Sequence, residues 1–364
     1  MCGLLKAGLA RLTLWNYRNH EETDLELTER LNLVCGRNAQ GKTNLLEAVS
    51  LVSTGRILRG TRDVQAIRQG ALEGIVQGET YDTGTTIRVT LRPNVKKRIE
   101  VNSLGLTRAS DVMGRIPTVS FSSEDMTIVT GEPSDRRDFM DRELAQVSPA
   151  YLKDLATYKR ALLQRNSLLK LAQTQVVAKE SFEVWEEQLA LSGVNIQERR
   201  KSWIEAINKC AKEFHAKLGS DEVLDLQYDT KEPGSDLVLR LAGDRGQDII
   251  RGTTSVGPHR DELVIRVEGQ EARHYGSQGQ QRTAVIALKL AVMDTVTDDL
   301  GVRPVLLLDD VFSDLDETRR SRLMEMTLEG GQVLLTCTEP IQAGRELVAQ
   351  AQIFWVESGK VSRA

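Results

Sequence analysis

LNLVCGRNAQGKTNLLEAV, residues 31–49, is the stretch of sequence that decides the fold. Residues 31–35 form a short, largely apolar run with the length of a buried strand, and Leu45, Leu46 and Val49 repeat at helical spacing. The intervening loop fits the pattern G-x-x-x-x-G-K-T and consists of Gly36, Arg37, Asn38, Ala39, Gln40, Gly41, Lys42 and Thr43. Between a strand and a helix, this pattern predicts a phosphate-binding loop.

Each residue type in the loop suits phosphate binding for its own physical reason. Gly36 and Gly41 permit backbone angles that a side chain would forbid, so that N–H groups turn toward phosphate oxygens at the positive end of a helix. Lys42 adds a point charge for the β and γ phosphates, and the Thr43 hydroxyl is placed to bind magnesium. We therefore expect ATP and Mg²⁺ as ligands.

The amino-acid composition limits how the protein can bind DNA or metal and in which cellular compartment it is expected. The chain has 52 acidic and 48 basic side chains and a net charge of −4, so any DNA contact must come from a local patch. The four cysteines are distant in sequence and form no C-x-x-C pair, which favours reduced thiols without a zinc site. No apolar run approaches the roughly twenty residues that a bilayer requires, so we expect a cytoplasmic protein without a membrane segment.

Basic residues concentrate after the loop helix and along the strands predicted to follow it. They are Arg56, Arg59, Arg62, Arg68, Arg92, Lys96, Lys97, Arg98 and Arg108. They form either an ordinary solvated face or a stripe for a phosphodiester backbone, and the sequence leaves both open. A second alternative concerns residues 16–20, which join two predicted strands: Tyr17 or Arg18 contacts a nucleotide base, or the segment is an ordinary turn.

Helical periodicity dominates residues 134–218. Apolar residues repeat at heptad-like spacing over 150–173 and at steps of seven over 182–210, with a polar connection at 174–180. This predicts an antiparallel helical hairpin. Ser192 and Arg199 interrupt the apolar seam, so a projecting arm and a bundle packed on the rest of the chain both remain open.

Two C-terminal segments carry further chemistry. The apolar run 305–308 is typical of a buried strand and ends in Asp309 and Asp310. Asp309 can hold magnesium, and Asp310 can polarise an attacking water. Ser277 and the N–H groups near Gly279 stand at a predicted helix N-terminus, which is a second anion site.

The order and separation of these parts predict the fold class. Asp309 lies far from Lys42 in sequence, whereas Ser277 stands shortly before Asp309. A long helical insertion therefore splits the nucleotide domain. This is the organisation of ABC-type ATPases: an α/β head, with a P-loop mixed sheet and flanking helices, and an inserted helical arm. We expect the head at residues 1–131 and 257–364 and the arm at 132–256. By analogy with this class, the serine of one subunit reaches the γ-phosphate held by another.

The motifs together resemble the RecF family of recombination and repair proteins, SMC-like members of the ABC ATPases. The resemblance rests on six segments in the order of that family, namely GRNAQGKTNLLEA, VTGEPSDRRDFMD at 129–141, YKRALLQRN at 158–166, GPHRDEL at 257–263, GSQGQQRT at 276–283 and LLLDDVFSDLD at 306–316. It implies ATP-dependent homodimerisation, DNA binding at gaps and single-strand/double-strand junctions, and RecO-like and RecR-like partners. The implied roles are gap repair, replication restart and the SOS response, with a weak DNA-dependent ATPase.

The resemblance also assigns residues. Gly36 to Thr43 would bind phosphates, with Lys42 catalytic, and Thr43 and Asp309 would hold Mg²⁺. Ser277, Gly279 and Gln280 would close the site of a second copy, with Asp314 at the seam between the copies. Asp310 would activate water, and Glu124 would link magnesium to the arm.

Two departures from the wider ABC pattern predict slow hydrolysis. Asp310 stands where glutamate is usual, and the strand ending at Thr338 lacks the expected histidine. Two other functions share such a head: the ATPase subunit of a membrane transporter and a short SMC-like structural DNA protein. The length and apolar stripe of the insertion disfavour the first, and the shortness of its helices disfavours the second.

Overall fold

The structure, a computed structural model, describes residues 8–57, 62–81, 83–219, 221–230, 236–311, 317–328 and 331–364. The chain divides into two units. The first comprises residues 1–125, 216–220 and 286–364, and the second comprises 126–215 and 221–285. Each unit therefore contains segments that are distant in sequence.

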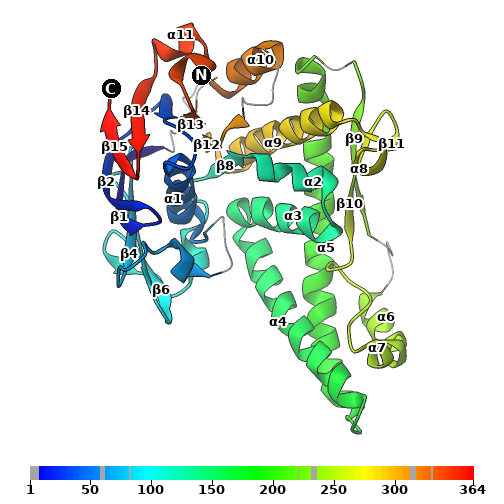
Figure 1. The fold of residues 1–364 in the computed structure, drawn as a ribbon. Coiled ribbons are helices and arrows are strands. Elements are labelled where there is room, and N and C mark those ends of the chain that lie inside the picture. Colours follow the sequence, from blue (N-terminus) through cyan, green and yellow to red (C-terminus); the bar gives the residue numbers. More distant parts are fainter. Residues whose placement is uncertain are drawn as a thin grey trace. The chain divides into compact units, whose positions relative to one another are not determined.

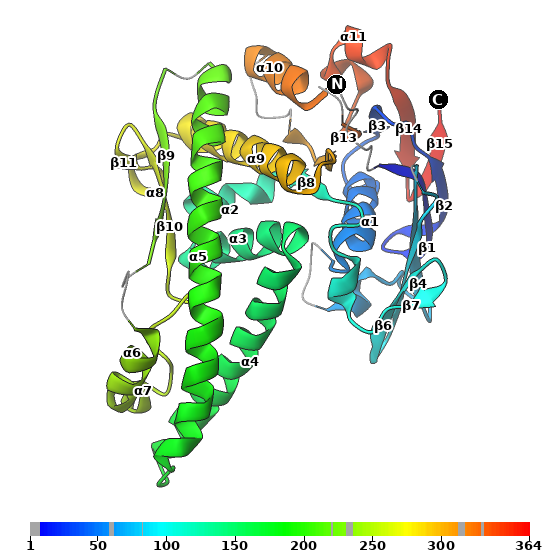
Figure 2. The same cartoon turned by 180° about the vertical axis from the view of Figure 1, so that it is seen from behind.

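The strand before the phosphate loop, β3, lies inside a mixed sheet of the first unit (Figures 1 and 2; β3 is labelled in Figure 2). The order of its six strands is β15-β14-β3-β13-β12-β8. Their bounds are β3 Leu31–Cys35, β8 Thr118–Phe121, β12 Val305–Leu308, β13 Val333–Cys337, β14 Gln352–Glu357 and β15 Lys360–Arg363. All pairs are parallel except β14 with β15. Because the carboxyl ends of parallel strands meet at one edge, the residues after β3, β8, β12 and β13 gather there.

A second sheet of the first unit is antiparallel, with the strand order β2-β1-β4-β5-β6-β7. The bounds are β1 Leu9–Tyr17, β2 His20–Glu26, β4 Gly74–Thr80, β5 Thr86–Arg92, β6 Val95–Val101 and β7 Leu104–Gly105. Helix α1 (Lys42–Thr54) shares one apolar core with both sheets, as Leu14, Leu45 and Phe354 illustrate. This core fixes the start of α1, and with it the phosphate loop.

The β1–β2 connection is shorter than the sequence pattern predicts, since both strands extend until only residues 18 and 19 remain between them. Asn16 and Arg18 have positive φ angles of 47° and 53°, and this permits the tight reversal. The remaining helices of the first unit are α10 Glu317–Leu328 and α11 Arg345–Val348, together with the 3₁₀ turns Asp63–Ala66, Ala109–Val112 and Pro340–Ala343; a further turn, Ser123–Met126, begins in this unit and ends at the first residue of the second.

The second unit is mainly helical and carries a three-stranded sheet in the order β11-β10-β9. Its helices are α2 Thr127–Thr130, α3 Pro133–Val147, α4 Pro149–Ala172, α5 Lys179–Lys217, α6 Leu237–Gly243, α7 Arg245–Arg251 and α8 Ala272–Tyr275; the last two residues of α5 belong to the first unit. The strands are β9 Leu224–Asp229, β10 Glu262–Val267 and β11 Gln270–Glu271, and α9 (Gln278–Leu300) begins in this unit.

Helices α4 and α5 form an antiparallel hairpin, and they lie side by side in both Figures 1 and 2. Near the start of α4, the Tyr151 hydroxyl accepts from Arg200 Nε of α5 at 2.9 Å. Near the end of α4, Arg165 Nε donates to Glu186 Oε1 at 3.1 Å. Early residues of one helix thus contact late residues of the other, and the predicted helical hairpin is confirmed.

The division into a head and an arm at residues 131/132 and 256/257 stays a prediction. Among the residues that the structure describes, none of the helices combines the length and the apolar composition of a membrane-spanning segment.

Candidate functional site

The phosphate loop has a backbone that two glycines make possible. Gly36 and Gly41 have φ angles of +148° and +117°. A Cβ atom on Gly36 would lie 2.3 Å from the carbonyl oxygen of Val356, and one on Gly41 would lie 2.6 Å from Asn19 Oδ1. Both positions exclude a side chain by close contact as well as by backbone angle.

The start of α1 is suited to an anion. Gly41 is the N-cap, no side chain caps the helix, and no residue of the first turn is acidic, so the helix itself places no negative charge at the positive end of its dipole. Lys42 is 8% exposed, and its Nζ donates to the carbonyl oxygens of Gly36 (2.6 Å) and Arg37 (2.9 Å). Arg37, Asn38 and Ala39 are exposed, so the outer part of the loop faces solvent.

The β1–β2 turn supports the loop, which the sequence pattern did not predict. Asn19 Nδ2 donates to the carbonyl oxygen of Gln40 at 2.7 Å, and Asn19 Oδ1 accepts from Asn44 Nδ2 at 2.8 Å. His20 is fully buried, its pKa is lowered by that burial, and its Nε2 donates to the carbonyl oxygen of Gly41 at 3.1 Å. A neutral imidazole therefore holds the second glycine of the loop.

The two candidates for a base contact have other roles. Tyr17 is fully buried. Arg18 forms a two-point contact with Glu47 of α1, at 2.6 and 2.8 Å. The segment is thus an ordinary tight turn, which was one of the two alternatives left open by the sequence, and it fastens the sheet to α1.

The acidic edge of the mixed sheet adjoins the loop. Asp309, which directly follows β12, accepts at Oδ1 from Thr43 Oγ1 (2.9 Å) and from Thr336 Oγ1 of β13 (2.8 Å). Thr336 Oγ1 also accepts from the backbone N–H of Asp310 at 2.9 Å. The fold thus brings Thr43, Asp309 and Asp310 together, and it adds Thr336, which no sequence motif indicated.

Glu124, the remaining predicted acidic residue, lies at the same edge of the sheet as Asp310. Asp310 is exposed and has a φ angle of 53°, and Glu124 is exposed in the turn after β8. Its neighbour Asp125 points inward instead, where it accepts from the Ser122 N–H at 2.7 Å and lies 3.5 Å from the fully buried Lys289. Of the two adjacent carboxylates, Glu124 is the accessible one.

The serine segment forms a reciprocal helix cap in the second unit. The backbone N–H of Ser277 donates to Gln280 Oε1 at 2.7 Å, and Ser277 Oγ accepts from the Gln280 N–H at 3.3 Å. Ser277 and Gly279 are exposed, whereas Gln280 is half-buried. The cap leaves the serine at the surface.

The basic residues proposed as a stripe are partly neutralised. Arg68, Arg92, Lys97 and Arg98 pair with carboxylates at distances of 2.7–3.1 Å. These pairs reduce the net charge available to a phosphate backbone. Arg59 of the stripe and Asp314 of the expected seam lie outside the described residues.

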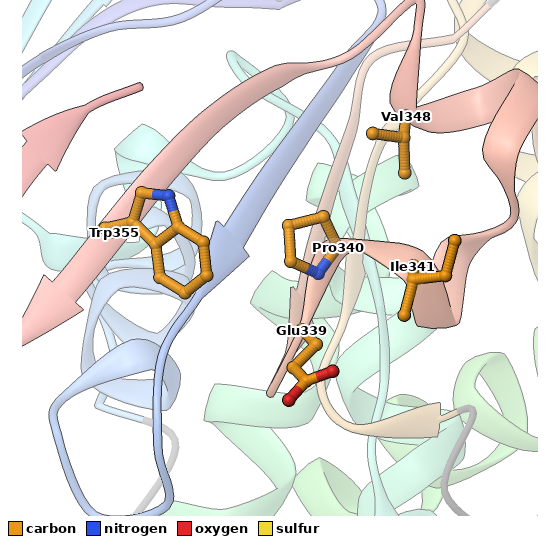
Figure 3. A pocket seen from close by; sticks show the side chains of 5 residues that line it. All are labelled: Glu339, Pro340, Ile341, Val348 and Trp355. Carbon is orange, nitrogen blue, oxygen red and sulfur yellow. The ribbon is translucent and has the colours of Figure 1, made fainter.

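A separate pocket lies on the mixed sheet close to the loop strand (Figure 3). It has a volume of about 500 Å³ and is lined by Glu339, Pro340, Ile341, Val348 and Trp355. Trp355 is the register partner of Cys35, which in turn pairs with Cys337; the Sγ atoms of these two free thiols are 3.2 Å apart. None of the predicted site residues lines this pocket.

Comparison with known proteins places this geometry in context. The sequence model of the RecF/RecN/SMC N-terminal domain matches residues 8–357. The protein described as DNA replication and repair protein RecF in Symbiobacterium thermophilum is 37% identical over 369 residues, covering 97% of each chain. Its counterpart in Clostridium tetani is 37% identical over 96% of this chain and 98% of its own.

A solved structure agrees with these matches. The recombination mediator protein RecF with ATP in the RecFOR pathway has a TM-score of 0.92 and 32% identity, covering 100% of this chain and 99% of that one. The predicted fold class, an ABC-type ATPase head with an inserted helical region, is thereby confirmed.

Proposed function

The chain belongs to the RecF family of DNA replication and repair proteins, and from this premise we propose that it is an ATP-dependent DNA-binding switch. It acts in the cytoplasm, in recombinational gap repair, replication restart and the SOS response. ATP binding joins two copies on DNA, and slow hydrolysis releases them. The observation that carries the proposal is the 2.9 Å contact between Thr43 and Asp309, which unites the phosphate loop with the acidic edge.

ATP is held by the loop from Gly36 to Thr43, where backbone N–H groups and Lys42 bind the phosphates. The Thr43 hydroxyl and the Asp309 carboxylate fit Mg²⁺, since both offer the hard oxygen ligands that this ion prefers and already lie in contact. Bound there, Mg²⁺ would neutralise phosphate charge. The RecF structure with ATP supports the choice of nucleotide.

Hydrolysis is assigned to Asp310, which accepts the proton of the attacking water. Its carboxylate is one methylene shorter than the usual glutamate, so we expect weak, DNA-dependent ATP turnover suited to a timer. Lys42 stabilises the charge that develops on the γ-phosphate. Glu124, exposed at the same edge, would link the magnesium ion to the arm.

The second copy supplies Ser277, Gly279 and Gln280 to close the site. Ser277 and Gly279 are exposed at the start of α9, where the positive end of the helix dipole favours an anion. A serine presented in this way suits the γ-phosphate held by another molecule, so ATP becomes part of the interface between two copies.

DNA with gaps and single-strand/double-strand junctions is the proposed substrate, and RecO-like and RecR-like mediators are the proposed partners. The family name and the RecFOR pathway of the solved relative support this. Binding to gapped DNA should weaken steeply with salt, because phosphate contacts release counterions. A response that does not change with salt would remove the argument for the basic residues.

The decisive experiment measures molecular mass by light scattering with and without a non-hydrolysable ATP analogue and Mg²⁺. We expect the unmodified protein to dimerise with nucleotide and Lys42→Met to bind no nucleotide and remain monomeric. Ser277→Arg should bind nucleotide normally and still remain monomeric, because only the shared contact is blocked. Dimers of Ser277→Arg would contradict the shared site.

A further inference from the structure

The side chain of Gln280 is engaged at both ends within its own molecule. Its Oε1 accepts from the Ser277 N–H at 2.7 Å, and its Nε2 donates to Glu222 Oε1 at 2.6 Å. An amide with both heavy atoms bonded in this way is fixed about its terminal torsion. The Gln280 amide is thus directed back toward its own chain, while Ser277 is presented at the surface.

Glu222 is itself anchored to the long helix of the hairpin. Its carbonyl oxygen accepts from Nδ1 of His215, a fully buried residue of α5, at 3.0 Å. The next residue, Val223, exchanges two hydrogen bonds with Glu268, at 2.5 and 3.0 Å. The Glu222 carboxylate therefore projects from a backbone held on both sides.

We propose that Glu222 is a positioning residue of the shared nucleotide site. Its carboxylate holds Gln280, Gln280 holds the backbone of Ser277, and Ser277 is thereby oriented toward the triphosphate of a second copy. Gln280 itself makes no contact with that nucleotide. This inference rests on the proposed function, and it links α5 to the serine through His215, Glu222 and Gln280.

The physical argument is one of preorganisation. Ser277 is exposed and stands directly before the first turn of α9, so a serine that is not held in place would lose entropy on forming the shared site. A charge-assisted hydrogen bond between Glu222 and Gln280 reduces that loss before the copies meet. Glu222 should therefore affect dimer formation and leave nucleotide binding at the phosphate loop unchanged.

Exchanging the two side chains tests the contact directly. In Gln280→Glu, two carboxylates oppose each other. The double variant combines Glu222→Gln with Gln280→Glu. Its amide at position 222 donates to the carboxylate at position 280, and that carboxylate still accepts from the Ser277 N–H. We expect Glu222→Ala and Gln280→Glu each to raise the protein concentration for half-dimerisation about tenfold or more. Glu222→Gln alone, and the double variant, should stay within about threefold of the unmodified protein.

The measurement is light scattering against protein concentration, with a non-hydrolysable ATP analogue and Mg²⁺ at saturation. Thermal unfolding and nucleotide affinity of Glu222→Ala and Glu222→Gln control for folding. A double variant as weak as Gln280→Glu would overturn the inference, because it would mean that Gln280 contacts the nucleotide directly.

Different results would reject the proposed function and the positioning role of Glu222. If Ser277→Arg dimerises, or the unmodified protein stays monomeric, the shared site is wrong and the positioning role falls with it. If Ser277→Arg is monomeric and the unmodified protein dimerises, the shared site stands, and the exchange of Glu222 and Gln280 alone decides the role of Glu222.

Discussion

Thr336 joins Asp309 to Asp310 through a single hydroxyl group. Its Oγ1 donates to Asp309 Oδ1 at 2.8 Å and accepts from the Asp310 N–H at 2.9 Å. Thr336 is 1% exposed and lies on β13, the strand adjacent to β12. The orientation of both carboxylates at the acidic edge therefore depends on a residue of the neighbouring strand.

Replacing Thr336 by valine keeps the shape and removes the hydroxyl. We expect ATP turnover to fall by about tenfold or more with a smaller loss of ATP affinity, and stability to fall by about 1–3 kcal/mol, because the Asp310 N–H loses its acceptor. Single-turnover hydrolysis and calorimetric titration separate the two effects. Thr336→Ser keeps the hydroxyl and serves as the control. Turnover of the valine variant equal to that of the serine variant would refute the role.

Asn19→Leu should loosen the phosphate loop. The change removes the bonds to the Gln40 carbonyl and to Asn44, at 2.7 and 2.8 Å, while it retains the volume of the side chain. We expect ATP affinity to fall about tenfold, the cost of two hydrogen bonds of ordinary strength. Fluorescent-nucleotide titration measures this, with thermal unfolding as the folding control. Unchanged affinity would show that the loop holds its shape without the turn.

Loss of Arg165 should strongly destabilise the second unit. Arg165 is fully buried and pairs with Glu186 at 3.1 Å and with Asp248 at 2.7 Å. Arg165→Leu leaves the buried carboxylate of Asp248 without its cation and leaves Glu186 with Arg245 as its remaining partner. An unpaired buried charge of this kind costs about 3–5 kcal/mol. Urea denaturation measures the loss.

Arg199→Leu is the matched control for that experiment, since it breaks another pair between α4 and α5, with Asp154. The pair is partly exposed, and we expect a loss of about 1 kcal/mol or less. Equal losses for the two variants would contradict the importance of burial.

His259 should make stability depend on pH. Its Nδ1 accepts from the Tyr158 hydroxyl at 2.6 Å, its Nε2 donates to the Thr254 carbonyl at 3.0 Å, and burial lowers its pKa to about 4. Between pH 4 and the unfolded value of about 6.5, the unfolded chain binds the extra proton. The free energy of unfolding therefore decreases by roughly 3 kcal/mol as pH falls through this window.

The His259→Gln variant isolates this contribution. Urea denaturation of both proteins at several pH values between 4 and 7 should show a smaller pH dependence for the variant. Parallel curves for the two proteins would mean that His259 titrates normally in the folded state.

Local patterns in the sequence were enough to predict the phosphate loop, the buried strand ending at Asp309 and Asp310, and the α4–α5 hairpin. Each depends on spacing within a short segment, because a strand, a helix or a glycine turn has a repeat that adjacent residues reveal. The order of the motifs then indicated an ABC-type head, and the comparisons confirmed it.

Only the tertiary structure showed the contacts that hold the site in shape. Asn19 binds Gln40 and Asn44, and His20 binds Gly41. Thr336 joins the two aspartates, and Glu222 holds Gln280. These residues are polar, follow no repeat, and meet partners that are distant in sequence. Their roles follow from sheet register and helix packing, which the long-range apolar core determines, so no short stretch of the chain encodes them.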